Sequence, residues 1–198
     1  KTEELLHDSS TALGHYSKAI ELNPNSGSAY NNRGIIYENH HNYGAALSDF
    51  KKATEIDSYD DTAFYNLSQV EYRLDQKEDA FRDIKKSVWI NPKNGGALAF
   101  KGLLEILTGD TASALADLNK SIELDKNMLD GYSYRYVILI AKHQNAEALT
   151  DINTCIHLDP KYVYYNDRGF LFFTTGRFDE ALADFNKAIL LCPDSARA

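Results

Sequence analysis

The sequence repeats itself with a period of 34 residues. One alanine recurs six times in the same register, with a single step of 33 residues before the last copy, as Ala12, Ala46, Ala80, Ala114, Ala148 and Ala181. A leucine or phenylalanine follows each alanine directly, and a bulky apolar residue follows four positions after it. Six copies in one phase indicate a chain built by stacking copies of one small unit.

Each alanine lies in a segment with helical periodicity. Apolar residues stand zero, one, four, seven and eight positions after it, as at Ala181, Leu182, Phe185, Ala188 and Ile189. These offsets place all of them on one face of an α-helix. In four copies a proline follows the alanine by 12 residues, at Pro24, Pro92, Pro160 and Pro193. Because proline cannot continue a helix, the segment is predicted to end there.

A second helix is expected upstream of each alanine segment, most clearly over residues 30–37 and 165–172. The position five residues before the alanine is occupied by His7, His41, Asp75, Gly109, His143 and Gly176. Gly, Asp and His all tolerate left-handed backbone angles, so this position is predicted to end the first helix. Three histidines are thereby explained without any chemistry, and each unit is predicted to be a pair of helices.

This pattern resembles the tetratricopeptide repeat (TPR) family, whose unit is a 34-residue helix-turn-helix. Residues typical of the family occur at the matching positions of the last full unit, at Tyr165, Arg168, Gly169, Phe172, Ala181, Phe185, Ala188 and Pro193. The resemblance covers the whole chain and implies an all-α fold, a right-handed superhelical solenoid of stacked antiparallel helix pairs. It implies a partial repeat over residues 1–26, the end of a first helix plus a second helix. Full repeats are expected over 27–60, 61–94, 95–128, 129–161 and 162–195.

Small residues on the first helices are expected to face the alanine row and allow close approach, at Gly34, Ser68, Gly102 and Gly169. Added bulk there should cost about 1–3 kcal/mol through overpacking. Tyr136 occupies this position in the repeat 129–161, so either its ring swings out beside the pair or the pair is splayed. Glu71 and Glu105, where the family has Tyr, are further departures from its pattern.

Charge and composition exclude several classes of function. The formal net charge of −8 argues against a general binder of nucleic-acid backbones and disfavours acidic partners. No stretch approaches the ~18 consecutive apolar residues of a membrane-spanning helix, so a soluble protein in the cytoplasm, without membrane insertion, is expected. A row of aspartates lies beside a row of lysines, and both are interpreted as solvated helix faces with local ion pairs. The rows are Asp49, Asp83, Asp117, Asp151 and Asp184, and Lys18, Lys52, Lys86, Lys120 and Lys187.

No catalytic motif is present. The sequence lacks HExxH, a glycine-rich phosphate loop, GxSxG and CxxC, so it predicts neither an enzyme nor a cofactor. His40 and His41 are adjacent, and adjacent helical residues point in different directions, so no metal site is expected. Cys155 occupies a position held by Ala or Ser in other units, which predicts a small buried residue.

The resemblance implies that the first helices line a concave groove. The residues expected to contact a partner there are Asn31, Asn32, Ile35, Tyr65, Asn66, Gln69, Arg73, Phe100, Leu103, Tyr134, Val137, Asn166, Asp167 and Phe170. This set begins rich in amides and becomes apolar and aromatic from Phe100 onward. Family members that clamp a C-terminal carboxylate use a cluster of cations, and Arg73 alone does not supply one.

Two interpretations of the groove residues stay open. Asparagine is a poor residue for a helix interior, so Asn31 and Asn32 either clamp the backbone of an extended peptide or form a hydrogen bond between helices. The apolar residues either form an exposed partner site or pack between adjacent first helices, the latter being almost equally favoured for Leu103 and Val137.

The leading hypothesis is a non-enzymatic module that binds a peptide or a partner helix in this groove. The alternative is a self-assembling scaffold, a homo-oligomer formed through the terminal repeats, since apolar terminal faces tend to associate. The half unit at the start and the missing polar capping helix after Ala198 motivate it. The same ends also fit a targeting arm of a larger protein.

Overall fold

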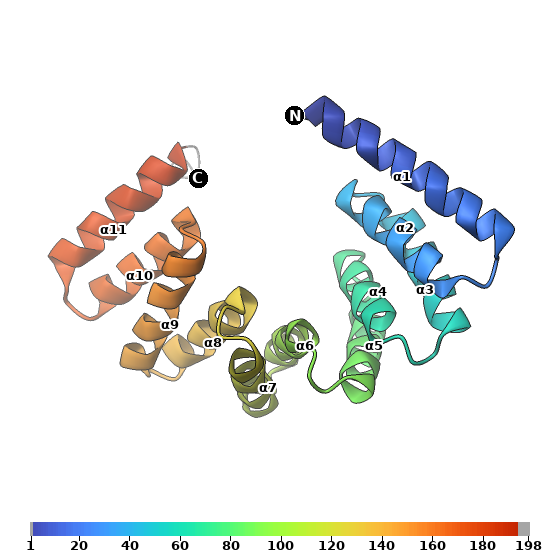
Figure 1. The fold of residues 1–198 in the computed structure, drawn as a ribbon. Helices are drawn as coiled ribbons and strands as arrows, with labels where there is room; N and C mark the ends of the chain where they lie inside the picture. The colour runs from blue at the N-terminus through green and yellow to red at the C-terminus, as the bar shows by residue number, and fades with distance from the viewer. Residues whose placement is uncertain (1, 194–198) are drawn as a thin grey trace. The chain divides into compact units, whose positions relative to one another are not determined.

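The structure, a computed structural model, describes residues 2–193, with side chains from residue 9 onward. Over this range the chain forms eleven α-helices and no strand (Figure 1). They are α1 (Thr2–Leu22), α2 (Gly27–Asn39), α3 (Tyr43–Ile56), α4 (Asp61–Arg73), α5 (Lys77–Ile90), α6 (Gly95–Thr108), α7 (Thr111–Leu124), α8 (Leu129–Ala141), α9 (Asn145–Leu158), α10 (Tyr162–Thr174) and α11 (Phe178–Leu191). The predicted all-α fold is confirmed.

The chain divides between residues 92 and 93 into two compact units, and each is described by itself. In unit 1, α2 packs against α3 and α4 against α5, while α1 lies against α2. In unit 2 the pairs are α6 with α7, α8 with α9, and α10 with α11. We call α2, α4, α6, α8 and α10 the first helices of these pairs, and α3, α5, α7, α9 and α11 the second helices.

The turns inside the pairs have the predicted left-handed geometry. Positive φ angles of 58°, 60° and 59° occur at His41, Asp75 and His143, and of 84° and 77° at Gly109 and Gly176. These are the five described turns between first and second helices, and they occupy the predicted position. The turn expected at His7 is wrong, because α1 continues as one helix from Thr2 to Leu22.

Polar caps fix where several helices begin. The side chains of Asn42, Asp60, Asn94 and Asp110 each accept a hydrogen bond from the backbone N–H three residues later. Each such cap satisfies an amide that the helix itself leaves unpaired and is worth about 1 kcal/mol. Asn42 and Asp110 cap the second helices α3 and α7, and Asp60 and Asn94 cap the first helices α4 and α6, so the caps fix helix starts both within and between pairs.

The alanine row forms the centre of each pair. Ala46, Ala80, Ala114 and Ala148 are completely buried, and Ala181 nearly so. The glycines opposite them allow the close approach that the sequence predicts: a Cβ built at Gly34 would lie 2.7 Å from Cε1 of Phe50. The ring four residues after the alanine, rather than the alanine itself, therefore limits the space at this glycine.

Tyr136 on α8 replaces that glycine with a buried ring. It packs among Leu139, Ala148 and Ile152 and makes an edge-on contact with Tyr164, with ring centroids 6.5 Å apart. The sequence left two outcomes open, and the ring is buried rather than exposed at the surface. It is therefore part of the core that links α8 to α9 and α10.

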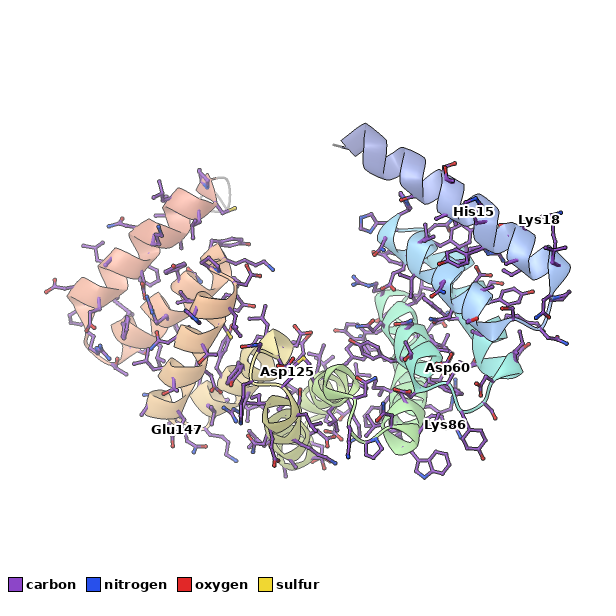
Figure 2. All side chains as sticks on the ribbon, viewed as in Figure 1. His15, Lys18, Asp60, Lys86, Asp125 and Glu147 are labelled. Atoms are coloured by element: carbon purple, nitrogen blue, oxygen red, sulfur yellow. The ribbon has the colours of Figure 1, made fainter. Side chains whose placement is uncertain are left out.

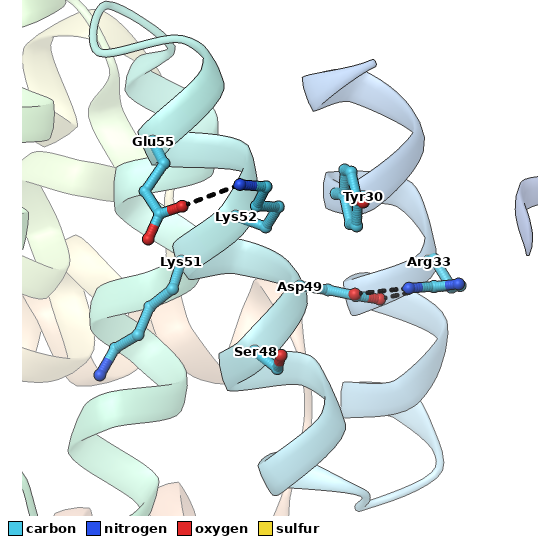
Figure 3. A pocket seen from close by; sticks show the side chains of 7 residues that line it. All are labelled: Tyr30, Arg33, Ser48, Asp49, Lys51, Lys52 and Glu55. Atoms are coloured by element: carbon cyan, nitrogen blue, oxygen red, sulfur yellow. Dashed lines mark hydrogen bonds and ion pairs between the residues drawn. The ribbon is translucent and has the colours of Figure 1, made fainter. Parts of the chain in front are cut away.

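The aspartate row is buried, so the expectation of a solvated face is wrong for it. Asp49, Asp83, Asp151 and Asp184 are buried and Asp117 is half-buried. The guanidinium of Arg33, 16 residues before Asp49 on the preceding first helix, donates two hydrogen bonds of 2.8 Å to its carboxylate (Figure 3). Arg135 and Arg168 hold Asp151 and Asp184 in the same way. A repeated charged clamp therefore ties the two helices of a pair together.

The lysine row behaves as expected in part. Lys18 pairs with Glu21 at 2.8 Å on α1, and Lys52 pairs with Glu55 at 3.1 Å on α3. Each pair lies on the exposed surface of its own helix. The ammonium of Lys86, labelled in Figure 2, instead lies 4.4 Å from the centroid of the Trp89 ring. The two lysine–glutamate pairs are local and contribute little to holding one helix against another, whereas Lys86 also lies 6.0 Å from the ring centroid of Phe64 on α4.

Candidate functional site

A pocket of ≈ 200 Å³ opens between the first helices α8 and α10 of unit 2. It is lined by Tyr136, Val137, Ile140, Asn166, Asp167 and Phe170. Four of these, Val137, Asn166, Asp167 and Phe170, belong to the set that the sequence predicts to contact a partner. We call this cavity the α8–α10 pocket.

Apolar side chains form the rim of the α8–α10 pocket. Val137 is 48% exposed and Phe170 is 58% exposed, although both are large apolar residues. Of the two interpretations that the sequence left open for Val137, exposure is the one observed. Exposed apolar surface beside a cavity is typical of sites that receive a partner group.

A hydrogen bond joins the two walls of the pocket. The Tyr136 hydroxyl donates to Oδ2 of Asp167 over 2.6 Å. Burial of the phenol, and then the adjacent Asp167 carboxylate, raise the pKa of Tyr136 well above its usual value, so the hydroxyl keeps its proton at physiological pH. The proton of this hydrogen bond therefore stays on Tyr136, and Asp167 is the acceptor.

Neighbouring first helices do not all pack against each other in the same way. In the described residues α6 packs directly against α8, and α2 against α4, whereas side chains such as Tyr136 and Tyr164 lie between α8 and α10. The single 33-residue step of the sequence falls in the same place, before α10. A bulky ring at a glycine position and a shortened link thus coincide with the pocket.

The predicted contact residues on α6 and the start of α8 are less accessible. Phe100 is only 8% exposed, so its place in an exposed apolar stripe is wrong. Leu103 is half-buried, and Tyr134 packs against a cluster that includes Ala99 and Ile138. These residues support the packing of α6 with α8 more than they present a surface.

In unit 1 the predicted amides bind each other. The side-chain nitrogen of Asn66 donates to Oδ1 of Asn31 over 3.0 Å, and both residues are buried. Of the two interpretations of Asn31, the hydrogen bond between first helices is the one observed. Asn32 next to it is half-buried.

The other predicted residues of unit 1 also have partners within the protein. Ile35 packs against the core cluster around Phe50, and Gln69 donates to the Tyr65 hydroxyl over 2.9 Å. Arg73 bonds to Glu38 at 3.3 Å. The structure therefore brings the pocket-lining residues of α8 and α10 together as a surface, and uses several of the residues in unit 1 for packing.

The sequence did not single out Ile140 or Tyr136 as lining a site. Ile140 lies three residues after Val137 and so on the same face of α8, whereas Tyr136 directly precedes Val137 and is buried. The available signal was the replacement of glycine by Tyr136, which the sequence identified only as a packing anomaly. The ring of Tyr136 packs against Ala148 and Ile152 of α9 and also meets Tyr164 of α10, so it lies where the three helices come together.

A buried carboxyl group on α4 was also missed. Glu71 is fully buried, and neither of its carboxylate oxygens has a hydrogen-bond partner among the described residues. Its nearest cation is Lys51, whose Nζ lies 4.0 Å from Oε1. Burial, and then the charge of Asp83, raise the pKa of Glu71 to about 8. Glu71 is therefore a proton-binding group near neutral pH rather than a permanent anion.

A second cavity, of ≈ 410 Å³, lies between α2 and α3 in unit 1. Figure 3 shows its lining: the Arg33–Asp49 clamp joins α2 to α3, and Lys52 bonds to Glu55 along α3. The polar groups that Figure 3 joins by dashed lines are already paired with one another. This cavity therefore belongs to the structural clamp, and we do not assign it a ligand.

Three further observations concern metal binding, membrane spans and the Cys155 thiol. Among the described residues, no three His, Cys, Asp or Glu side chains are grouped so that they could hold a metal ion. Within the same range no helix combines the length and the apolar character needed to cross a membrane. Cys155 is buried as predicted, and burial raises the pKa of its thiol to about 12.

Pairs of helices joined by left-handed turns at one register position define a helical-repeat protein. Three family models, each described as tetratricopeptide repeat, match residues 15–48, 96–128 and 163–195. Together with the helix pairs and their repeated turns, these matches establish that the chain belongs to the tetratricopeptide repeat family, as the sequence predicts. The repeat supports a role as a protein–protein interaction module, and members of the family are typically non-enzymatic.

Solved structures with the same fold are numerous. The chain is similar to YrrB, described as a TPR protein with an unusual peptide-binding site, with a TM-score of 0.68, 24% identity, and coverage of 90% of this chain and 93% of that one. It is also similar to PilF of Pseudomonas aeruginosa, with a TM-score of 0.84, 16% identity, and coverage of 96% and 87%. At these identities the likeness establishes the all-α TPR solenoid alone. A comparison with curated proteins found no match.

Proposed function

We propose that the protein is a non-enzymatic interaction module that binds a segment of another polypeptide at the α8–α10 pocket. The observation that supports this proposal most is the exposure of Val137 and Phe170 beside a cavity on the first helices. Covering these two partly exposed apolar side chains with a partner favours binding by roughly 25 cal/mol per Å² of apolar area buried. A segment with one anchoring side chain fits this geometry.

In this proposal Phe170 anchors the partner, and the buried groove residues have a structural role. Phe170 and Val137 contact the partner directly, whereas Phe100, Asn31 and Asn66 hold the first helices in place. Replacing an exposed anchor should weaken binding without unfolding the protein. Replacing Phe100 should instead destabilise the fold, so that variant is a poor test of binding.

The test is a selection from a displayed library of random peptides, followed by affinity measurements on the enriched sequences. Phe170→Ala should weaken binding of the enriched peptides about fivefold or more, which corresponds to about 1 kcal/mol. Phe178→Ala is the matched control, since Phe178 is a similarly exposed ring, 62% exposed at the start of α11. Equal losses for the two variants, or no enriched peptide, would contradict the proposal.

A second candidate function is self-association through α11, the homo-oligomer that the sequence offers as the alternative. On this helix Leu182 is 61% and Leu190 is 72% exposed. Leu47 and Leu149, the counterparts of Leu182 in other pairs, are half-buried. Sedimentation over a concentration series should then show a dimer that Leu182→Glu dissociates, and a monomer at every concentration would end this candidate.

A further inference from the structure

The carboxylate in the α8–α10 pocket is only partly used by the protein. A carboxylate offers about four lone-pair sites, and among the described residues the one hydrogen bond to Asp167 comes from the Tyr136 hydroxyl. The Asp167 side chain is half-buried, so its remaining acceptor capacity faces the pocket that it lines. The pocket therefore presents acceptor sites to whatever enters it.

Within the described residues no cation neutralises Asp167. Arg168, the next residue, is held by Asp184 and by the Asn153 side chain, and Arg135 is held by Asp151 and Asn119. The clamp aspartates thus each have a guanidinium, whereas Asp167 has a neutral phenol. A negative charge without a cationic partner attracts a cation from outside, and the net charge of −8 adds to that attraction.

The walls of the pocket suit an aliphatic stem that ends in a charge. Val137, Ile140 and Phe170 provide apolar contact on the way in, and the ring of Phe170 can also face a cation. Lysine and arginine combine these properties, because a chain of methylene groups leads to a charged head. The volume of ≈ 200 Å³ is below the range of about 300–1,000 Å³ usual for small-molecule sites. One side chain therefore fits better than a free metabolite.

We infer that the α8–α10 pocket recognises a lysine or arginine side chain of the partner polypeptide, whose charged head pairs with Asp167 and whose stem contacts Val137 and Phe170. This inference rests on the proposed function and names the chemistry of the partner at that site. Asn166 on the rim can accept a further hydrogen bond from the same head group. A basic segment is accordingly the partner that this module binds.

The test uses a matched series of soluble peptides with one variable central residue: Lys, Arg, Leu, Gln or Glu in an otherwise identical polar host. Binding to the whole protein is followed by NMR titration, which detects weak complexes. The Lys and Arg peptides should bind about tenfold more tightly than the Leu, Gln and Glu peptides, the equivalent of one ion pair of about 1.4 kcal/mol. The preference should shrink as salt is added.

Asp167→Asn separates recognition from structure. The asparagine side chain keeps an oxygen that accepts the Tyr136 hydrogen bond, so the helices stay linked, but the charge is gone. The preference for Lys and Arg should fall to about twofold or less while the melting temperature stays within a few degrees of the wild type. Phe178→Ala is again the control and should leave the preference unchanged.

The outcomes distinguish this inference from the function on which it rests. A Lys and Arg preference that survives in Asp167→Asn overturns the inference. Peptides that bind in a Phe170-dependent way without any preference for a basic residue also overturn it, but leave the proposed function intact. If library peptides show no dependence on Phe170, the proposed function fails as well.

Discussion

The buried carboxyl of Glu71 predicts an unusual dependence of stability on pH. Its pKa is about 8 in the folded protein, against an ordinary value of 4.5, because the group is fully buried and Asp83 is near. Between these two values the folded state keeps a proton that the unfolded chain has lost. This contribution to the free energy of unfolding is therefore complete below about pH 4.5 and is lost as the pH rises to about 8.

The magnitude follows from the same two values. Each pKa unit corresponds to about 1.4 kcal/mol, so the full difference gives an upper limit of about 5 kcal/mol. Glu71→Gln replaces the acid by a neutral side chain of the same shape, and its amide can donate to Asp83. At pH 9 the variant should be more stable than the wild type by about 3 kcal/mol, since relaxation around a buried charge lowers the limit. At pH 4.5 the two should differ by less than about 1 kcal/mol.

Urea unfolding at pH 4.5, 7 and 9 measures these differences, followed by circular dichroism and by the fluorescence of Trp89, the single tryptophan, on α5 of unit 1. Glu105→Gln is the matched control in unit 2. Burial raises the pKa of Glu105 as well, but Lys101 at 2.5 Å opposes that rise. Its pH-dependent gain should therefore be smaller. Parallel pH profiles for Glu71→Gln and the wild type would refute the reasoning.

Three further predictions concern packing, charge and reactivity. Gly34→Ala should destabilise the protein by about 1–3 kcal/mol in urea unfolding, because the new Cβ would lie 2.7 Å from the Phe50 ring; an unchanged midpoint would contradict the close approach. Arg135→Met should cost about 3 kcal/mol, since it leaves the buried Asp151 carboxylate without its guanidinium, and adding Asp151→Leu should recover part of this loss. In the folded protein at pH 8, Cys192 should react with a thiol reagent well before Cys155, whose burial raises its thiol pKa to about 12; equal rates would contradict that burial.

The fold was predictable because its determinants are local and repeated six times. The left-handed turns at His41, Asp75 and His143 follow from the residues at one register position, and the buried alanines follow from helical periodicity. The turn at His7 failed because one weak signal near an end of the pattern does not stop a helix.

The buried aspartates were not predicted because periodicity describes one helix at a time. Asp49 lies on the polar side of its own helix, and only the packing of the pair brings Arg33 to it. The constant separation of 16 residues between Arg or Lys and Asp was a usable signal. The exception is Asp83, which has Leu67 at that position in place of Arg or Lys. Lys101 pairs with Glu105 four residues later, whereas Leu67 offers no cation to Glu71 at the same spacing.

The location of the candidate site was predictable from the sequence, but which residues are exposed there was less so. Val137 and Phe170 are exposed beside a pocket, whereas Phe100 and Asn31 are buried between helices. The difference depends on how closely neighbouring first helices approach. That distance depends on side chains from several helices, so it cannot be inferred from any single position of the repeat.

The central claim is that the first-helix surface between α8 and α10 binds polypeptide. The most direct measurement is NMR mapping of an enriched library peptide onto the backbone amides of the labelled protein. The account predicts that the largest shifts fall at Val137, Asn166, Asp167 and Phe170, and that Phe170→Ala needs at least about fivefold more peptide to produce them. Shifts concentrated on α11 or on the outer faces of the second helices, with those four amides unmoved, would contradict it.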